Sequence, residues 1–599
     1  MINYLRHQLR HFIFFYTYLG NRVFVILFLS LVTGFLDGFG LAMFIPLIQV
    51  AGEESIDNSQ VLESLGVLKF LVVGIANAGF ELTPIVILTF LFVIFLLKGL
   101  IKYFEGYYKV IIQMYFVKKI RYQMVDSLGN MNFKDFLKLD AGRIQNTLSG
   151  EIYKIVSAYV AYFNTLQSVV LLLVYLVLAL MANFQFAILV SLGGYLTNLI
   201  YKIIYRHTET ASINNSKLSH IYQSLLIQSV QYFKYLKATN YFEKYKLKLR
   251  SYVDKIEDEQ KKIGIFNAIL QASREPLVIG VVILVIIVQI NVLEGNIATI
   301  FLSLLFFYRA LNYIMVVQTS WQSFTSNLGG LHVGLELLED FRNGEEKSSG
   351  TIAVERIHNI DLKDVSFCYN PDNFVLKNID INIERKLTYA LVGRSGSGKT
   401  TLTNLLAGLI DPSSGQFFIN GVPREQVKMS SFRNRIGYIT QEPVIFNDTV
   451  FNNITFWSEF TPENILRFKN AIKLANLEEL VNSFPDGENT VLGDNGILIS
   501  GGQKQRISIA RELFKDVDVL IFDEATSALD SETEKSIQQN IESLKGSCNI
   551  ILIAHRLSTV KNADEILVMK DGFIEARGSF SELMVSNRSF KNMVELQEF

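Results

Sequence analysis

The chain has 599 residues, with 56 Lys or Arg against 57 Asp or Glu, so its formal net charge is −1. This balance excludes a nucleic-acid-binding protein that relies on bulk positive charge. Apolar residues make up 50% of the chain and charged residues 19%, and the mean hydropathy is +0.28. These values exclude disorder, a collagen-like chain and an ordinary water-soluble globule. Two cysteines are too few for a disulfide framework.

Long apolar runs fill the chain up to about residue 340. A helix needs about 20 residues to cross the bilayer core, and runs of that kind recur along this half. The six predicted spans are Val23–Val50, Pro84–Tyr108, Ser157–Met181, Phe184–Ile204, Leu277–Val292 with its helical lead-in, and Ile297–Val317. Barrel-type alternation is absent from these runs, so we predict helices.

Charge along the chain predicts the orientation of these spans. Residues 1–22 carry arginines among aromatic side chains and have no signal-peptide cleavage site, so we expect an amphipathic arm on the membrane surface. The connections 109–143 and 202–262 are rich in Lys and Arg, whereas 51–82 is acidic. Basic connections stay on the cytoplasmic side, so both termini are predicted to be cytoplasmic.

The two basic connections contain no proline and keep a helical apolar spacing. We therefore expect the helices to run on past the membrane by about 15–20 residues, or roughly 22–30 Å. Each extension must turn at its tip, near Asn132–Leu139 and near Val230–Ala238. The last helix should continue to about Asp340, which gives a membrane domain over 23–340. A polar linker over 341–356 then leads to a second domain over 357–599.

A glycine-rich pattern follows the β-rich run Tyr389–Val392. It has the form G-x-x-x-x-G-K-T between a strand and a helix. Its glycines let backbone N–H groups surround phosphates, its lysine supplies charge to the β- and γ-phosphates, and its threonine hydroxyl binds Mg²⁺. The predicted nucleotide-contacting residues here are Gly393, Arg394, Ser395, Gly396, Ser397, Gly398, Lys399, Thr400 and Thr401.

The second element is a pair of acidic residues. It follows the apolar run Val519–Phe522, which has the character of a buried parallel strand. Asp523 at its end is predicted to hold the Mg²⁺ shell. Glu524 is predicted to polarise the attacking water. Together with the phosphate loop, the pair predicts nucleotide hydrolysis.

Between these two elements lies Ile499-Ser500-Gly501-Gly502-Gln503, which resembles the signature of the ABC-transporter ATPase domain, where the usual first residue is Leu. The resemblance implies a nucleotide contact for Ser500, Gly501, Gly502 and Gln503. It further implies that Tyr369 stacks on adenine, that Gln441 couples Mg²⁺ to the membrane domain, that Asp530 in Ser527-Ala528-Leu529-Asp530 lies on a loop across a dimer, and that His555 contacts the γ-phosphate. Lys386 departs from the glycine usual in the family, which affects a turn.

One ATPase domain and six spans resemble an exporter-class (type IV) half-transporter. The fold implied is a six-helix all-α transmembrane domain followed by an α/β P-loop ATPase domain. The resemblance also implies a homodimer with two composite sites for ATP and Mg²⁺. Residue usage, with few prolines and many Phe, Ile and Lys, suggests a bacterial inner-membrane protein.

Ionisable side chains within predicted spans are costly and indicate function or pairing. The four that we single out are Asp37, Lys98, Arg274 and Arg309. Three cations, doubled in a dimer, would form a basic cavity that suits a phosphate or pyrophosphate head group. The alternative is structural: Asp37 pairs with Lys98 or Arg309, Lys98 extends towards the interface, and Arg274 lies below the bilayer.

The membrane half also resembles bacterial lipid-linked oligosaccharide flippases and, less specifically, the lipid A flippase. The resemblance rests on Gly34–Pro46, Gln60–Ala78 and Tyr308-Arg309-Ala310-Leu311. It implies membrane-lipid partners and outward movement of an anionic lipid or lipid-linked oligosaccharide. Two other hypotheses stay open: an exporter of small amphipathic drugs or peptides, and an ATP-gated channel or regulator. The presence of Glu524 and His555 argues against the last.

Overall fold

The computed structural model describes residues 2–44, 46–47, 70–77, 79–81, 83–182, 184–291, 297–346, 350–371, 373–523, 539, 542, 544–553 and 560–595. Three predicted site residues, Glu524, Asp530 and His555, lie outside these ranges. The chain divides into two compact units. The first contains Met1–Met131 and Lys138–Glu345, and the second contains Asn132–Leu137 and Glu346–Phe599. An all-helical membrane domain followed by an α/β domain is thus confirmed as the fold class.

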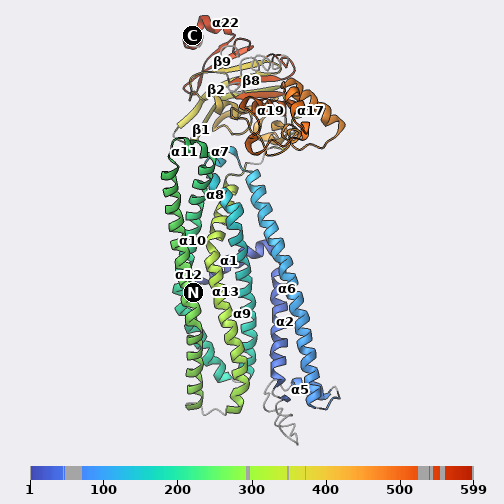
Figure 1. Cartoon of the computed structure of the whole chain (residues 1–599), viewed down its shortest axis with the longest axis vertical. Coiled ribbons are helices and arrows are strands. Elements are labelled where there is room, and N and C mark those ends of the chain that lie inside the picture. Colours follow the sequence, from blue (N-terminus) through green and yellow to red (C-terminus); the bar gives the residue numbers. More distant parts are fainter. Residues whose placement is uncertain are drawn as a thin grey trace. The chain divides into compact units, whose positions relative to one another are not determined.

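The first unit is built from long helices (Figure 1). Its elements are α1 (Ile2–Leu19), α2 (Arg22–Ala42), α5 (Phe70–Asn77), α6 (Pro84–Gly129), α8 (Ala141–Asn146), the π-helical turn η2 (Thr147–Glu151), α9 (Ile152–Ala182), α10 (Phe184–Gln231), α11 (Phe233–Ala238), α12 (Phe242–Asn291) and α13 (Ile297–Asn343). The 46, 48 and 50 residues of α6, α10 and α12 confirm that helices continue far beyond a membrane-spanning length.

Helix ends fall where the sequence supplies caps and breaks. The arm α1 is separated from α2 at Gly20, whose φ is +58°. The Thr83 hydroxyl accepts from the Val86 N–H at 3.4 Å and Pro84 takes the first turn, so α6 begins there. The expected tips coincide with helix breaks after Gly129 and Gln231. The helix α13 ends at Asn343, three residues later than expected.

Small residues let α13 approach its neighbours closely, and α13 lies against both α9 and α10. A Cβ built at Gly329 would lie 2.1 Å from the Ser212 carbonyl oxygen, and one at Gly334 would lie 2.6 Å from Ile155 Cδ1. Any side chain at these positions would push the helices apart. In the same unit α2 lies beside α6 and α10 beside α12 (Figure 1).

Among the described residues, three helical runs are long and apolar enough to cross a membrane: Arg22–Ala42, Pro84–Gly129 and Ala141–Met181. These runs correspond to the first three predicted spans. The other three fall on α10, α12 and α13, whose side chains are described only in part. Six spans therefore stay a prediction.

The second unit contains two sheets and short helices (Figure 1). Its strands are β1 (Asn359–Asn370), β2 (Asn373–Glu384), β3 (Thr388–Val392), β4 (Ser414–Ile419), β5 (Val422–Pro423), β6 (Ile436–Ile439), β7 (Val519–Asp523), β8 (Asn549–Ile553), β9 (Glu565–Lys570) and β10 (Phe573–Gly578). Its helices are α7 (Phe133–Phe136), α14 (Lys399–Leu406), η3 (Arg424–Gln426), α15 (Met429–Arg433), α16 (Val450–Thr455), α17 (Pro462–Leu474), α18 (Glu478–Ser483), η4 (Gly487–Asn489), η5 (Asp494–Gly496), α19 (Gly501–Phe514), α22 (Phe580–Ser586) and α23 (Arg588–Glu595).

The larger sheet has the strand order β10-β9-β3-β8-β7-β6, and its five strands β9, β3, β8, β7 and β6 are parallel. The strands β3 and β8 are buried along their whole length. Continuous apolar runs of this kind are expected where helices or loops cover both faces of a parallel sheet. The smaller sheet, in the order β2-β1-β4-β5, is antiparallel.

Candidate functional site

Strand register brings the predicted nucleotide residues to one edge of the larger sheet. Leu391 of β3 and Asp523 of β7 are both paired with Ile553 of β8, so β3 and β7 end at the same level. Ile439 of β6 pairs with Phe522 of β7, which places Gln441 just past the same edge. Ligands of open α/β sheets bind at the carboxyl ends of the strands. The phosphate loop, Asp523 and Gln441 therefore gather where such a ligand would lie.

The loop between β3 and α14 has the properties of a phosphate cradle. The first turn of α14 has no side-chain cap, which leaves backbone N–H groups available to an anion. Gly398 precedes the helix with φ +102°, a conformation that favours glycine. The Ser397 hydroxyl is buried and has no hydrogen-bond partner among the described residues. An unsatisfied buried hydroxyl beside uncapped N–H groups fits a phosphate oxygen.

Lys399 is 6% exposed, and its ammonium group donates to the carbonyl oxygens of Gly393 at 2.8 Å and Arg394 at 3.1 Å. These bonds fold the side chain back over its own loop. On the outer side of that loop Arg394, Ser395 and Gly396 are exposed. The backbone N–H groups at the start of α14 and the Lys399 ammonium group thus lie on the same loop, where the sequence pattern predicts phosphate binding.

Tyr438 of β6 is a site residue that the sequence analysis missed. Its hydroxyl oxygen lies 3.3 Å from Asp523 Oδ2 and 3.2 Å from Asn404 Oδ1, so it connects β7 to α14. Burial raises the pKa of Tyr438 to about 12, with the nearby Asp523 carboxylate adding to the rise. The phenol is therefore protonated near neutral pH and can hold the Asp523 carboxylate. The available signal was a tyrosine within the short apolar run Ile436–Ile439, which forms the strand next to the one that ends in Asp523.

The donor set at this edge fits Mg²⁺. Asp523 offers a carboxylate, Thr400 a hydroxyl and Gln441 an amide oxygen, and hard oxygen ligands are those that Mg²⁺ prefers. Asp523 is half-buried, whereas Thr400 and Gln441 are exposed at the same sheet edge. The roles of these residues, and that of Thr401 at the start of α14, stay predictions.

The signature residues open a helix, as expected: Ser500 is the N-cap of α19. The Gln503 N–H donates to Ser500 Oγ at 3.3 Å, and the Ser500 N–H donates to Gln503 Oε1 at 2.8 Å. This capping box gives Ser500 and Gln503 a structural role that the sequence analysis did not foresee, although S-x-x-Q is its usual pattern. Gly501 is exposed, and a Cβ built there would meet no atom within 4 Å.

Tyr369, the predicted adenine-stacking residue, lies near the end of β1. It is half-buried and packs edge-on against Phe367, with ring centroids 4.9 Å apart. The short helix α7, which lies in the first expected tip, belongs to the same compact unit. Phe133 of α7 packs against the core of that unit, and Lys134 Nζ lies 5.3 Å from the Phe367 ring. A segment that the chain places between two long helices is thus part of the α/β unit.

The first unit holds a buried acidic cluster where α2, α6 and α9 meet. Asp37 is 3% exposed and accepts hydrogen bonds from Lys98 and from the Tyr175 hydroxyl. Lys98 thus forms an ion pair with Asp37, which is the structural alternative stated above. Neither residue is a free charge in the described arrangement. The pairing favours the structural alternative, and a role of Lys98 in substrate binding stays a prediction.

A second polar cluster, around Glu105 of α6, was missed because the sequence analysis did not count this carboxylate. Glu105 accepts from Ser30 at 2.6 Å, from Gln167 at 2.8 Å and from Thr33 at 3.3 Å. Ser30 and Glu105 each lie seven residues from the Asp37–Lys98 pair on the same helices. Seven residues are two helical turns, so the two clusters lie about 10 Å apart along the seam.

The remaining predicted substrate residues behave differently from each other. Arg274 is 7% exposed and donates to the Thr319 hydroxyl, while α12 continues without interruption past Pro276. Arg309 of α13 is half-buried, lies within electrostatic range of Tyr175 and Tyr313, and forms no ion pair with a described residue. Among the described residues, Lys98 thus pairs with a carboxylate, whereas Arg274 and Arg309 do not.

Comparisons with known proteins cover both units. The ABC transporter profile matches residues 376–527, and the profile of the ABC transporter transmembrane region matches residues 23–314. The heterocyst differentiation ATP-binding protein HepA of Nostoc sp. is 30% identical over 494 residues, 82% of this chain and 80% of that protein. An ATP-dependent lipid A-core flippase of Cupriavidus pinatubonensis is 29% identical over 519 residues, 84% and 86% of the two chains. A solved bacterial Atm1-family ABC exporter with ATP bound superposes with a TM-score of 0.76 at 20% identity, covering 97% of this chain and all of that chain (100%).

Proposed function

The chain belongs to the ABC transporter family, as an exporter whose ATPase domain is coupled to transport, and from this premise we propose that it moves an anionic lipid or lipid-linked oligosaccharide from the inner to the outer leaflet. The observation that carries the proposal is the likeness to an ATP-dependent lipid A-core flippase over 84% of the chain, which is far more than the ATPase domain alone. Arg309 supports it as a cation within the sixth predicted span.

The ATPase part of the proposal assigns roles to residues at the carboxyl edge of the sheet. The uncapped start of α14, Ser397 and Lys399 would bind the phosphates of ATP. Thr400, Gln441 and Asp523 would hold Mg²⁺, which supplies positive charge to the phosphate oxygens. Glu524 would polarise the attacking water, and His555 would contact the γ-phosphate. Tyr438 would keep the Asp523 carboxylate in position.

We place two copies in the working unit because each chain contains one phosphate loop and one signature. The exposed Gly501 at the start of α19 would face the phosphate loop of a second copy, with Asp530 on the loop between them. Packing of Phe133 in the α/β unit supports α7 as an element that transmits movement to the helices α6 and α8 that flank it in the chain. The proposed location is the bacterial inner membrane, with both termini in the cytoplasm.

An exporter of small amphipathic compounds is the second candidate. The pairing of Lys98 with Asp37 favours it, because this pair removes one of the cations on which an anionic cavity would depend. The two candidates differ in the charge that the cavity must bind. They therefore differ in the response of the ATPase to anionic and neutral amphiphiles.

The test is the ATPase rate of the purified protein in lipid vesicles against a panel of ligands. The panel contains polyprenyl-pyrophosphate glycans, lipid A-like lipids and neutral amphipathic drugs. We expect several-fold stimulation by the anionic lipids, and Arg309→Gln should remove most of it because a charge-assisted contact is lost. Arg206→Gln, on the exposed cytoplasmic part of α10, is the control for a general charge effect. Stimulation by neutral drugs alone would favour the second candidate, and Glu524→Gln should abolish hydrolysis in either case.

A further inference from the structure

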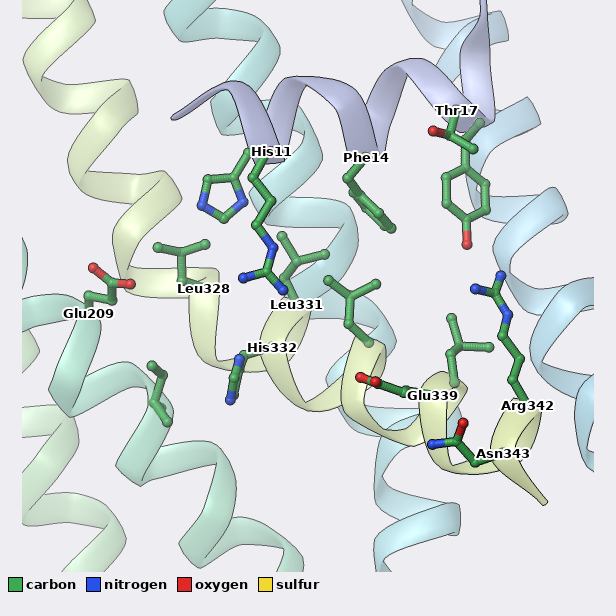
Figure 2. A pocket seen from close by; sticks show the side chains of 15 residues that line it. His11, Phe14, Thr17, Glu209, Leu328, Leu331, His332, Glu339, Arg342 and Asn343 are labelled. Carbon is green, nitrogen blue, oxygen red and sulfur yellow. The ribbon is translucent and has the colours of Figure 1, made fainter. Parts of the chain in front are cut away.

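A pocket of about 650 Å³ lies in the first unit between α1, α10 and α13. Its volume is in the range of sites that bind drug-sized ligands. In Figure 2, His11 and Phe14 project from α1 towards α13, and Arg342 projects from α13 towards α1. Asp37, Lys98 and Arg309 are not among the residues that line it, so the pocket is a different site from the clusters described above.

The floor of the pocket is apolar, and its rim is charged. Leu328, Leu331 and Leu338 of α13 line it as buried side chains, together with the half-buried Phe14 of α1. An apolar floor beneath a charged rim suits an amphipathic ligand, whose apolar part packs against the floor. The ligand should thus have an apolar part beside its polar group.

The rim carries equal numbers of guanidinium and carboxylate groups. Arg10 and Arg342 are exposed, as is Glu339, while Glu209 is half-buried. None of these four forms an ion pair with a described residue of the chain. Glu339 and Arg342 lie three residues apart on α13, so they share one face of that helix. A purely anionic ligand would meet both carboxylates, and a purely cationic ligand would meet both guanidinium groups. A ligand that carries both charges satisfies all four.

The position of α1 indicates where such a ligand comes from. The helix directly precedes α2, the first membrane-spanning run, and its outer face exposes Ile13 and Tyr16. Aromatic and basic residues gather at the junction: Arg22 Cζ lies 4.0 Å from the centroid of the Tyr115 ring, and Lys119 Nζ lies 5.6 Å from that of Tyr18. Such clusters mark the level of lipid head groups. Residues of α1 line the pocket directly before the first predicted span, which is the side from which a lipid of the cytoplasmic leaflet would enter.

We propose that this pocket binds a phosphoethanolamine group, supplied by a zwitterionic phospholipid of the cytoplasmic leaflet. Arg342 and Arg10 contact the phosphate, Glu339 and Glu209 contact the ammonium group, and the leucines of α13 with Phe14 cover the start of the acyl chains. The bound lipid holds α1 against α10 and α13. This inference does not depend on which cargo the exporter moves, because the site is tested by binding without ATP.

The experiment is native mass spectrometry of the delipidated full-length protein titrated with phosphatidylethanolamine, phosphatidylglycerol and soluble glycerophosphoethanolamine. Wild-type protein should retain phosphatidylethanolamine in preference to phosphatidylglycerol. Arg342→Gln should weaken phosphatidylethanolamine binding about tenfold, because one charge-assisted contact to the phosphate is lost. Glu339→Gln should reverse the preference towards phosphatidylglycerol, because it removes the anion that selects an ammonium group.

Matched controls are Arg206→Gln on α10 and Glu257→Gln on α12, both exposed and outside the pocket. They should bind like the wild type. All four substituted side chains are exposed or at the rim, and circular dichroism with size-exclusion chromatography checks that each variant is folded. Equal binding of both phospholipids by wild type, or an unchanged preference in Glu339→Gln, would overturn the proposal. If soluble glycerophosphoethanolamine bound as tightly as the phospholipid, the acyl chains would contribute nothing. That result would overturn a membrane lipid as the source of the ligand, while recognition of the phosphoethanolamine group would stand.

Discussion

Two lysines show how differently the two units of this molecule treat a buried charge. Lys98 of the membrane unit lies in a seam between three helices and is neutralised by the Asp37 carboxylate. Lys399 of the ATPase unit is still more buried, yet its ammonium group is held by the carbonyl oxygens of its own loop. These bonds place the ammonium group at the loop that is predicted to bind phosphate. The Lys98 charge thus joins two helices, whereas the Lys399 charge lies at a predicted ligand site.

The helix seam of the membrane unit and the phosphate loop also differ in how their uncharged polar groups are held. In the membrane unit, Ser30, Thr33 and Gln167 converge on Glu105, so this half-buried carboxylate has several donors. In the ATPase unit, the buried Ser397 hydroxyl lacks a partner among the described residues. Buried polar groups are normally satisfied, and exceptions concentrate at functional sites. Ser397 is one of several such groups among the described residues, and it lies in the loop that the sequence predicts to bind phosphate.

The largest expected effect tests the Asp37–Lys98 pair. Lys98→Met should lower the stability of the membrane unit by about 3–5 kcal/mol, because it leaves a buried carboxylate without its counter-charge. The double variant Asp37→Asn with Lys98→Met removes both charges and should recover most of that loss. Thermal unfolding of the detergent-purified proteins gives the coupling between the two positions.

Lys399→Ala is the comparison variant for this experiment. It should lower the ATPase rate roughly a hundredfold or more, because a preorganised donor to the phosphates is removed, while the membrane unit melts as in the wild type. Equal melting of Lys98→Met and the double variant would show that Lys98 is not a structural counter-ion. It would then return to the set of cations available to cargo.

The sequence predicts features formed by neighbouring residues better than contacts between residues far apart along the chain. The phosphate loop is predictable because its glycines, Lys399 and Thr400 lie within eight consecutive residues, so local order fixes the chemistry. Tyr438 lies 85 residues from Asp523 along the chain, and only the pairing of β6 with β7 brings them together. The Asp37–Lys98 pair was one of several alternatives, because helix composition does not specify which faces meet. The Glu105 cluster needs three helices in register, which periodicity alone does not supply.

A smaller effect is expected for Tyr438→Phe, which tests the ATPase side of the contrast. It removes the hydroxyl beside Asp523 and should lower the ATPase rate roughly two- to tenfold, the equivalent of one net hydrogen bond. Tyr389→Phe is the matched control, since the Tyr389 hydroxyl accepts from the Glu384 N–H at 2.9 Å, away from the carboxyl edge of the same sheet. It should leave the ATPase rate close to that of the wild type.

The pH dependence of Tyr438 has a definite sign. Its pKa is raised from 10.0 to about 12, chiefly by burial, so the folded protein favours the neutral phenol. The resulting stability is fully present below about pH 10 and is lost as the pH rises towards 12. ATPase activity between pH 6 and 9 should therefore show no step from this group. A step in that range that disappears in Tyr438→Phe would contradict the assignment.

The smallest expected effect concerns a strained turn before β3, the strand that leads to the phosphate loop. Lys386 stands between β2 and β3 with φ +70°, and it is exposed, so its side chain gains little from packing. A non-glycine residue in the left-handed region costs about 1–2 kcal/mol. Glycine avoids this cost, but it has more conformational entropy in the unfolded state, which offsets part of the benefit. Lys386→Gly should thus stabilise the ATPase unit by about 0.5–1 kcal/mol in thermal unfolding. Its N–H donates to the Asn549 side chain, a backbone contact that survives the substitution.

Lys386→Ala separates strain from charge, because it removes the ammonium group and keeps the Cβ atom. If strain is the cause, Lys386→Ala should melt like the wild type and only Lys386→Gly should melt higher. Equal gains in both variants would instead point to the charge of the lysine. The ATPase rate of Lys386→Gly carries the remaining information, since β3 leads directly into the phosphate loop. An unchanged rate would show that the turn is a tolerated local strain, whereas a lower rate would show that it positions the loop.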